Sequence, residues 1–176
     1  MINYTGWDRD YQKYRHQYLD VYDEVMKSTS ENVEFLETRV ANLVGRKHAV
    51  AVKSATDALH FSLLCHGIGE GDEVLVTDFS WISTSSCISM VGATPVFCDI
   101  DPETYHISIE SIKRMASTKT KALIYTHLFG NITDSTHIQT FCQENNIIFI
   151  EDSAQSLGSS LNGVMAGSIG DCSSFS

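Results

Sequence analysis

Short apolar runs alternate with helix-like stretches from residue 48 to residue 152, and no other feature of the sequence constrains the fold as strongly. The short runs are rich in valine and isoleucine, which favour strands, and the stretches between them have the apolar spacing of helices. A repeated strand–helix pattern predicts an α/β protein whose mostly parallel sheet lies between two layers of helices, a three-layer α/β/α fold. We expect strands at 48–53, 72–77, 94–100, 121–128 and 147–152, and helices between them at 55–66, 80–91, 108–116 and 134–145.

The N-terminal part of the chain has a different pattern and is predicted to be helical. Residues 1–30 are expected to form a helical arm, and residues 31–176 a large domain. A second helix, at 32–44, is expected to end at Gly45. The arm helix places apolar side chains on one face, where they are expected to pack against a core or another subunit: Tyr11, Tyr14, Tyr18, Tyr22 and Val25.

Charge and composition exclude several classes of function. The 12 basic and 22 acidic residues give a net charge of -10, which opposes binding to nucleic acid. No apolar run approaches the roughly 20 residues that span a bilayer, and the polar start Met1-Ile2-Asn3-Tyr4 lacks the apolar stretch of a signal peptide. The 5 cysteines are not paired as C-x-x-C and fit neither a disulfide scaffold nor a zinc module. We therefore expect a cytoplasmic protein that binds no membrane and no metal.

Two stretches invite a phosphate-binding interpretation, and only one of them is correctly placed. Gly67, Gly69 and Gly71 follow a predicted helix and lead into a strand, which is the reverse of the dinucleotide-binding order. They predict a helix stop and a tight turn instead. The stretch from Ser54 to Asp57 does follow a predicted strand and begins a helix, where free backbone N–H groups and the helix dipole favour an anion. From the residues alone, an ordinary N-cap explains this stretch more simply.

A carboxylate ends the apolar strand predicted at 147–152. Ligands of parallel sheets bind beyond the carboxyl ends of the strands, and Asp152 and Gln155 lie there. A buried aspartate at this position needs a cation or several hydrogen bonds, and a protonated pyridine nitrogen would supply one. A carboxylate that caps the following turn is the alternative.

Two ring-bearing side chains also follow predicted strands. Trp81 could stack on a planar cofactor at the mouth of the crevice, although packing in the core would explain a lone tryptophan equally well. His127, in the stretch T-H-L-F-G, is a candidate for contact with substrate, and a structural histidine is the alternative.

With these residues in place, the chain from about residue 31 to 176 resembles the DegT/DnrJ/StrS family of sugar-nucleotide aminotransferases. Members of this family have the fold-type I architecture of pyridoxal-phosphate enzymes and form homodimers with shared active sites. Ala55 occupies a position where many members carry glycine. The matching stretches, in order, are SATDAL, GIGEGDEVLV, SWIST, GATPVFCDIDPETY, TKALIYTHLFG, IIFIEDSAQSLGSS and GDCSSFS.

The resemblance implies a site for pyridoxal 5'-phosphate and a role for each matching residue. Asp152 pairs with the pyridine N–H and keeps the ring protonated, so that the ring can act as an electron sink; it is the expected catalytic residue. Trp81 stacks on the ring, and Gln155 approaches the ring hydroxyl. The phosphate group is bound by Ala55, Thr56, Asp57 and Ser176.

The implied reaction transfers an amino group, from glutamate, to C3 or C4 of a nucleotide-linked keto-deoxysugar. The run T-D-A-L resembles members that act at C3 and S-W-I-S-T resembles members that act at C4, so both carbons remain open. In the family, the lysine that binds the cofactor covalently follows the serine matched by Ser176. Since a sheet interrupted at Ser176 would expose strand edges, we expect that lysine in a longer chain.

Two alternatives to amino transfer remain open. A dehydratase of the same family uses the same cofactor with histidine in place of the lysine, and that position lies beyond Ser176. A non-catalytic paralogue would keep only the fold, but the presence of Thr56, Trp81, Asp152 and Gln155 argues against it.

Overall fold

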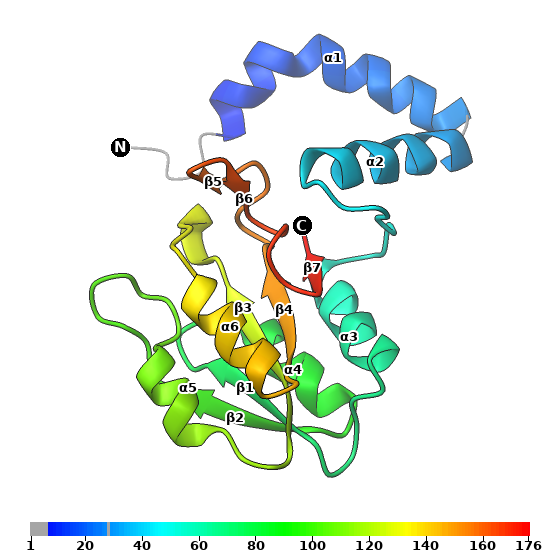
Figure 1. Cartoon of the computed structure of the whole chain (residues 1–176). Coiled ribbons are helices and arrows are strands. Elements are labelled where there is room, and N and C mark those ends of the chain that lie inside the picture. The colour runs from blue at the N-terminus through cyan, green and yellow to red at the C-terminus, as the bar shows by residue number, and fades with distance from the viewer. Residues whose placement is uncertain (1–6, 28) are drawn as a thin grey trace. The chain divides into compact units, whose positions relative to one another are not determined.

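The computed structural model describes residues 7–27 and 29–176, which belong to two compact units (Figure 1). The first unit holds α1 (Trp7–Lys27), most of α2 (Thr29–Leu43) and Lys47–Ala51. The second unit holds Leu43–Arg46 and Val52–Ser176. Residues 1–6 and 28 of the predicted arm, including the polar start of the chain, lie outside the described residues. The domain boundary that we place after residue 30 stays a prediction.

A five-stranded sheet forms the centre of the second unit. Its strands run in the order β2-β1-β3-β4-β7, and every neighbouring pair is parallel. Parallel neighbours need crossover connections, and helices lie in those that join β1 to β2, β2 to β3 and β3 to β4. The strands are β1 (Glu73–Thr77), β2 (Thr94–Cys98), β3 (Thr120–Thr126), β4 (Ile148–Asp152) and β7 (Cys172–Ser174).

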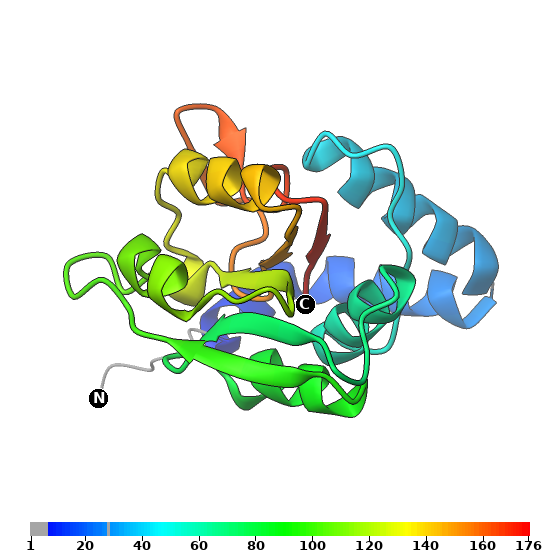
Figure 2. The same ribbon diagram turned by 60° about the horizontal axis from the view of Figure 1, so that its bottom comes forward.

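Helices cover both faces of this sheet, which confirms the three-layer prediction (Figure 2). Alternate residues of a strand face opposite sides, so Val74 and Val76 pack in one core and Leu75 packs in the other. The first core is covered by α3 (Ala55–Cys65) and α4 (Ile82–Met90). The second is covered by α5 (Ile109–Met115) and α6 (Thr136–Glu144).

The first predicted strand is wrong, because residues 48–53 form no strand. A strand exists only where its backbone pairs with a neighbour, and this stretch has none among the described residues. The Ala51 N–H instead donates to Glu37 Oε1 at 2.7 Å. An apolar run alone could not reveal the missing partner. The other four predicted strands and all four predicted helices from 55 to 145 are confirmed, as is the turn at 67–71.

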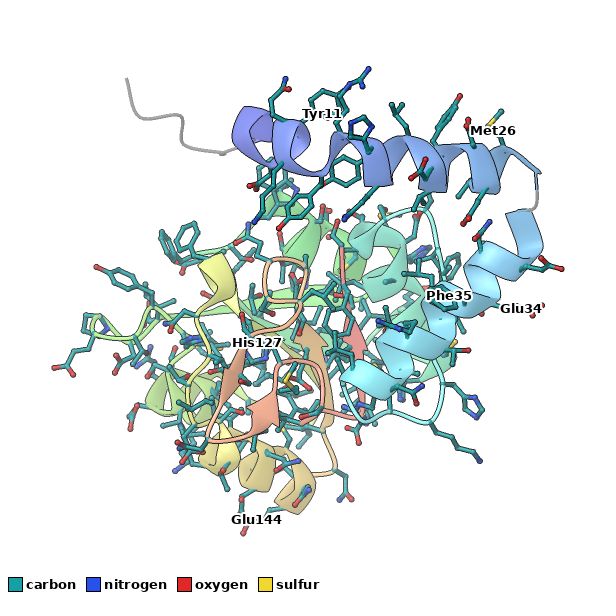
Figure 3. All side chains as sticks on the ribbon, turned by 90° about the horizontal axis from the view of Figure 1, so that it is seen from above. Tyr11, Met26, Glu34, Phe35, His127 and Glu144 are labelled. Carbon is teal, nitrogen blue, oxygen red and sulfur yellow. The ribbon has the colours of Figure 1, made fainter. Side chains whose placement is uncertain are left out.

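The tyrosine stripe predicted for the arm lies on α1. The Tyr11 and Tyr18 rings are stacked with centroids 6.5 Å apart, and Tyr14 meets Tyr18 edge-on at 6.4 Å. Figure 3 shows Tyr11 and Met26 projecting from this helix. Tyr11 and Tyr18 are exposed, so the stripe is available for packing against another surface. Among the described helices, none combines the length and apolar character needed to cross a membrane.

Between β4 and β7 the chain makes short elements that the sequence did not predict. They are β5 (Ser160–Leu161) and β6 (Val164–Met165), which pair as an antiparallel hairpin. A 3-10 turn, η1 (Leu128–Gly130), follows β3. After the hairpin, the chain returns to the sheet so closely that a Cβ atom on Gly170 would lie 2.4 Å from the Phe149 carbonyl oxygen.

We predict that Gly170→Ala destabilises the protein by about 1–3 kcal/mol, because the added methyl group overlaps the backbone of β4 and forces the returning segment away. Gly69→Ala is a matched control, since its Cβ would meet the Val91 carbonyl oxygen at an ordinary 3.5 Å. Urea unfolding of the two variants measures the difference. Equal unfolding midpoints would contradict this close approach.

Candidate active site

The candidate site lies where the strands end. Asp152 is the last residue of β4, and its neighbours across the sheet are Thr126 at the end of β3 and Ser174 at the end of β7. Asp152 is only 6% exposed. The topological rule for parallel sheets therefore places this buried carboxylate at the edge where ligands bind.

Asp152 receives hydrogen bonds but no ion pair from the described residues. The Thr84 hydroxyl donates to Oδ2 at 2.9 Å, and the Ala154 N–H donates to Oδ1 at 3.3 Å. The Ser174 hydroxyl lies 3.5 Å from Oδ1. Within the described part of the chain, no lysine or arginine forms an ion pair with this carboxylate. Burial raises the pKa of Asp152 above its usual value, although these hydrogen bonds oppose the shift.

Hydrogen bonds between hydroxyl groups orient the Thr84 side chain. Thr84 gives its single hydroxyl proton to Asp152, so Ser80 Oγ must donate to Thr84 Oγ1, 2.8 Å away. Ser80 Oγ also lies 3.4 Å from Thr126 Oγ1. The first turn of α4 is thereby linked to the ends of β3 and β4.

The predicted phosphate-binding stretch lies at the start of α3. The Ser54 side chain accepts a hydrogen bond from the Asp57 N–H at 3.2 Å, which is the N-cap that the residues alone favour. The cap leaves N–H groups of the first helical turn, at Ala55 and Thr56, without a partner inside the helix. Thr56 Oγ1 donates to Ser83 Oγ at 2.8 Å and so connects α3 to α4. The cap is therefore compatible with an anion at the same helix end.

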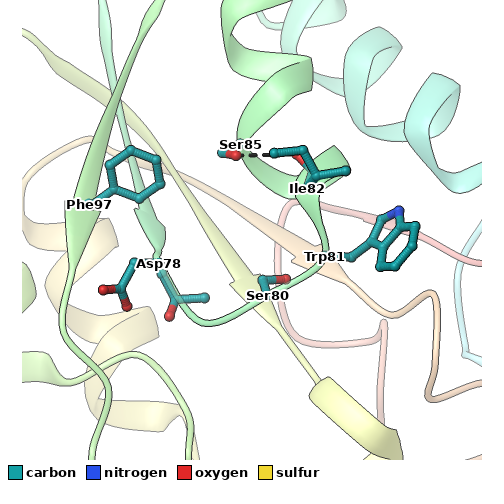
Figure 4. Close-up of a pocket in the computed structure, with 7 residues that line it drawn as sticks. Asp78, Ser80, Trp81, Ile82, Ser85 and Phe97 are labelled. Atoms are coloured by element: carbon teal, nitrogen blue, oxygen red, sulfur yellow. Dashed lines mark hydrogen bonds between the residues drawn. The ribbon is translucent and has the colours of Figure 1, made fainter.

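Trp81 directly precedes α4, and its side chain is 71% exposed. This exposure favours a stacking surface over packing in the core. The indole lies at the edge of a pocket of about 510 Å³, which Figure 4 shows in close-up. Asp152 and Thr56 do not line this pocket, so it adjoins the carboxylate network and does not contain it. Its lining residues are Thr77, Asp78, Ser80, Trp81, Ile82, Ser85 and Phe97.

Gln155 has a fixed orientation. The Phe129 N–H lies 2.7 Å from Oε1 of Gln155, and a backbone N–H can only donate, so the amide oxygen must face it. The amide Nε2 is therefore turned away and can donate to a ligand oxygen. Phe129 adopts a left-handed conformation with φ of 58°, which is uncommon for a residue with a side chain.

The remaining two candidates differ in accessibility. Ser176 is exposed and follows β7 by two residues. His127 is fully buried, and its Nε2 lies 2.8 Å from Glu151 Oε2. Figure 3 labels His127 within the packed second unit. The rings of His106 and Tyr125 pack against His127, which is the environment expected of a structural histidine, and its contact with substrate stays a prediction.

The sequence did not reveal the residues that form hydrogen bonds with the predicted site residues. Thr84 lies in the S-W-I-S-T stretch, one helical turn after the predicted start of α4, and that spacing was the available signal. Glu151 could have been noticed because a buried strand that ends in two acidic residues must face them to opposite sides. Ser80, Ser83 and Ser174 give no signal, since serines near helix and strand ends are common.

Sequence comparison adds a family and named relatives. Residues 12–176 match the DegT/DnrJ/EryC1/StrS aminotransferase family. A GDP-perosamine synthase from Caulobacter vibrioides is 39% identical over 144 residues, which are 82% of this chain and 38% of that protein. A UDP-N-acetyl-3-dehydro-alpha-D-glucosamine 3-aminotransferase from Acidithiobacillus ferrooxidans is 43% identical over 141 residues, which are 80% of this chain and 38% of that protein.

Structural comparison agrees with the sequence match. The crystal structure of a DegT DnrJ EryC1 StrS aminotransferase from Brucella abortus superposes with a TM-score of 0.88 at 27% identity, over 97% of this chain and 48% of the other. This chain spans less than half the length of each of these three proteins. The family match over nearly the whole sequence shows that the chain belongs to the DegT/DnrJ/EryC1/StrS aminotransferase family.

Proposed function

We propose that this chain forms the cofactor-binding part of a pyridoxal-phosphate-dependent aminotransferase that acts on a nucleotide-linked keto-sugar. The single observation that carries the proposal is the buried carboxylate of Asp152, which lies at the ligand-binding edge of the sheet without a cationic partner among the described residues. Family membership and the names of the relatives supply the type of reaction.

The surroundings of Asp152 fit the ring of pyridoxal phosphate. A buried, ionised carboxylate is unfavourable unless it is paired, and burial raises the pKa of Asp152 accordingly. The protonated ring nitrogen of the cofactor is a cationic N–H donor of the kind that this carboxylate lacks. Pyridoxal phosphate supplies an electron sink for the substrate carbon when it is bound, and that sink depends on the protonated ring.

Other residues of the chain would hold the cofactor around this pair. The exposed indole of Trp81 offers a stacking face. The Gln155 Nε2 is oriented to donate to the ring hydroxyl, because Oε1 is already bound by the Phe129 N–H. The phosphate group would be bound at the start of α3 by the backbone N–H groups of Ala55 and Thr56, together with the Ser176 hydroxyl. Asp57 would lie beside it, with its own N–H bonded to Ser54 Oγ.

The substrate is proposed at the level of its class. The two relatives named above carry GDP and UDP in their names, so similarity to them supports a nucleotide-linked sugar without selecting the nucleotide. We propose glutamate as the amino donor and the keto group at C3 or C4 of a deoxysugar as the acceptor, in the synthesis of an amino sugar for a polysaccharide.

We extend the proposal to a homodimer with shared active sites in the cytoplasm. The exposed tyrosine stripe of α1 is consistent with packing against another subunit. The 5 cysteines of the chain all lie in the described part and are unpaired, as is usual in a reducing compartment.

We predict that the full-length protein, supplied with pyridoxal phosphate and glutamate, converts one member of a panel of nucleotide-linked keto-sugars into an amino sugar. Mass spectrometry of the sugar product and a coupled assay for 2-oxoglutarate measure the reaction. A sugar product that has lost a hydroxyl group would favour the dehydratase. Absence of both product and visible absorbance from bound cofactor would favour the non-catalytic paralogue.

Asp152→Asn is expected to lower turnover by at least about a hundredfold, because the neutral amide cannot hold the ring nitrogen protonated.

The same substitution should not lower the stability of the cofactor-free protein. The raised pKa of Asp152 means that its ionised form costs stability as the pH rises above the usual aspartate pKa, so the variant should be no less stable at neutral pH. Assays and thermal unfolding check the two effects. The control is Asp99→Asn on the exposed Asp99–Arg114 pair, which should retain turnover; unchanged turnover in Asp152→Asn would refute the proposal.

Thr84→Val removes the shortest hydrogen bond to Asp152 and should raise the pKa of that carboxyl further. A protonated Asp152 cannot pair with the ring N–H, so the variant should lose cofactor affinity at a higher pH than the wild type as the solution is acidified. Titrations with pyridoxal phosphate over a range of pH measure this shift. Thr140→Val, which removes an exposed hydroxyl on α6 that bonds to the Thr136 carbonyl, should leave the profile in place. A shift to lower pH would be inconsistent with the assigned role of Thr84.

A further inference from the structure

Glu151, the neighbour of Asp152 on β4, is a fully buried carboxylate to which the proposed chemistry gives no role. Consecutive residues of a strand face opposite sides of the sheet, so Glu151 points away from the network around Asp152. A charge buried this deeply needs donors of its own. The identity of those donors indicates what Glu151 does.

Four N–H groups donate to the two oxygens of Glu151. His127 Nε2 at 2.8 Å and the Gly167 N–H at 2.9 Å share Oε2. The N–H groups of Ile169 and Gly170 both reach Oε1 at 2.7 Å. Because an ionised carboxylate only accepts, Nε2 of His127 must carry a proton. Three of the four donors thus belong to the backbone segment Gly167–Gly170, which leads from the β5–β6 hairpin into β7.

Arg46 holds the same segment through its carbonyl groups. Its Nε donates to the Gly167 carbonyl oxygen at 2.9 Å, and its Nη2 donates to that of Gly170. The Nη2 atom also lies 3.7 Å from Glu151 Oε1. Burial alone would raise the pKa of Glu151, but the hydrogen bonds from His127, Gly170 and Gly167 outweigh it and keep the pKa below the usual value. The segment is therefore wrapped around a carboxylate that remains ionised.

The ring of Phe175 connects this segment to the candidate active site. A Cβ atom on Gly167 would lie 2.2 Å from Phe175 Cζ, so the aromatic ring rests directly on the Gly167 backbone. Phe175 stands between Ser174, which approaches Asp152, and Ser176, the proposed phosphate ligand. Movement of Gly167 would therefore move the residue that separates these two serines.

We propose that Glu151 is a positioning residue, which fixes the segment Gly167–Gly170 and, through the contact of Gly167 with Phe175, sets the place of Ser176 beside the phosphate group of the cofactor. His127 supports Glu151 in this role. The inference rests on the proposed function, since it assumes that pyridoxal phosphate binds. It gives the two neighbouring residues different roles. Asp152 binds the ring of the cofactor, and Glu151 positions the segment Gly167–Gly170, on which the place of Ser176 depends.

The test is Glu151→Gln in the full-length protein, with binding of pyridoxal phosphate compared with binding of pyridoxal. Either orientation of the glutamine amide would place its NH2 group against N–H donors, so the segment could not keep its position. The two ligands differ only in the phosphate, so the ratio of their dissociation constants isolates the phosphate contacts. We expect the variant to reduce the preference for pyridoxal phosphate about tenfold or more, since small displacements of a binding group have effects of this order.

Two further variants separate positioning from general loss of stability. Ile112→Ala destabilises the core beneath α5 and should leave the ligand preference unchanged. His127→Phe removes one donor from Glu151 and should reduce the preference by a smaller factor, and it replaces Glu151→Gln as the test if that variant does not fold. An unchanged preference in a folded Glu151→Gln or His127→Phe protein, or an equal loss in Ile112→Ala, would overturn the inference. A wild-type protein that binds neither ligand would contradict the proposed function, and the inference with it.

Discussion

The two buried carboxylates at the end of β4 are the constraint on which the rest of the site depends. Each must be matched by donors because burial strongly disfavours an unpaired charge. Both oxygens of Glu151 accept hydrogen bonds, from His127 and from the backbone N–H groups of the segment Gly167–Gly170. Asp152 is matched by weaker hydroxyl and backbone contacts, and its pKa is raised. This difference is the basis of the two roles that we propose: Glu151 would organise the protein, and Asp152 would pair with a cationic ligand.

The parallel sheet and a few hydroxyl contacts explain how residues distant in sequence form one site. The parallel sheet brings the ends of β3, β4 and β7 together. Hydroxyl contacts then join α3 to α4 and α4 to Asp152. We attribute the arrangement of Trp81 and Gln155 to this scaffold, because they follow β1 and β4. The start of α3 is joined to α4 by the contact between Thr56 and Ser83. A small set of backbone and hydroxyl hydrogen bonds thus sets the geometry that the proposed cofactor would meet.

Local patterns in the sequence predicted most of the fold, and long-range pairing explains what they missed. The alternation of strands and helices from residue 72 to residue 152 is a local property, and the structure has each of those elements. The run at 48–53 has the composition of a strand but no partner, which no local pattern can reveal. The role of His127 was ambiguous for the same reason, since its partner Glu151 lies 24 residues away. Asp152 could be selected in advance because a carboxylate at the end of a buried strand is unusual in any fold.

We propose that Asp152 holds the pyridine ring of the cofactor in its protonated form. NMR of isotope-labelled pyridoxal phosphate bound to the full-length protein reports directly whether the ring nitrogen carries a proton. We expect a protonated nitrogen in the wild-type protein at neutral pH and loss of that proton in Asp152→Asn. A ring nitrogen that is unprotonated in the wild-type protein, or equally protonated in both proteins, would contradict it.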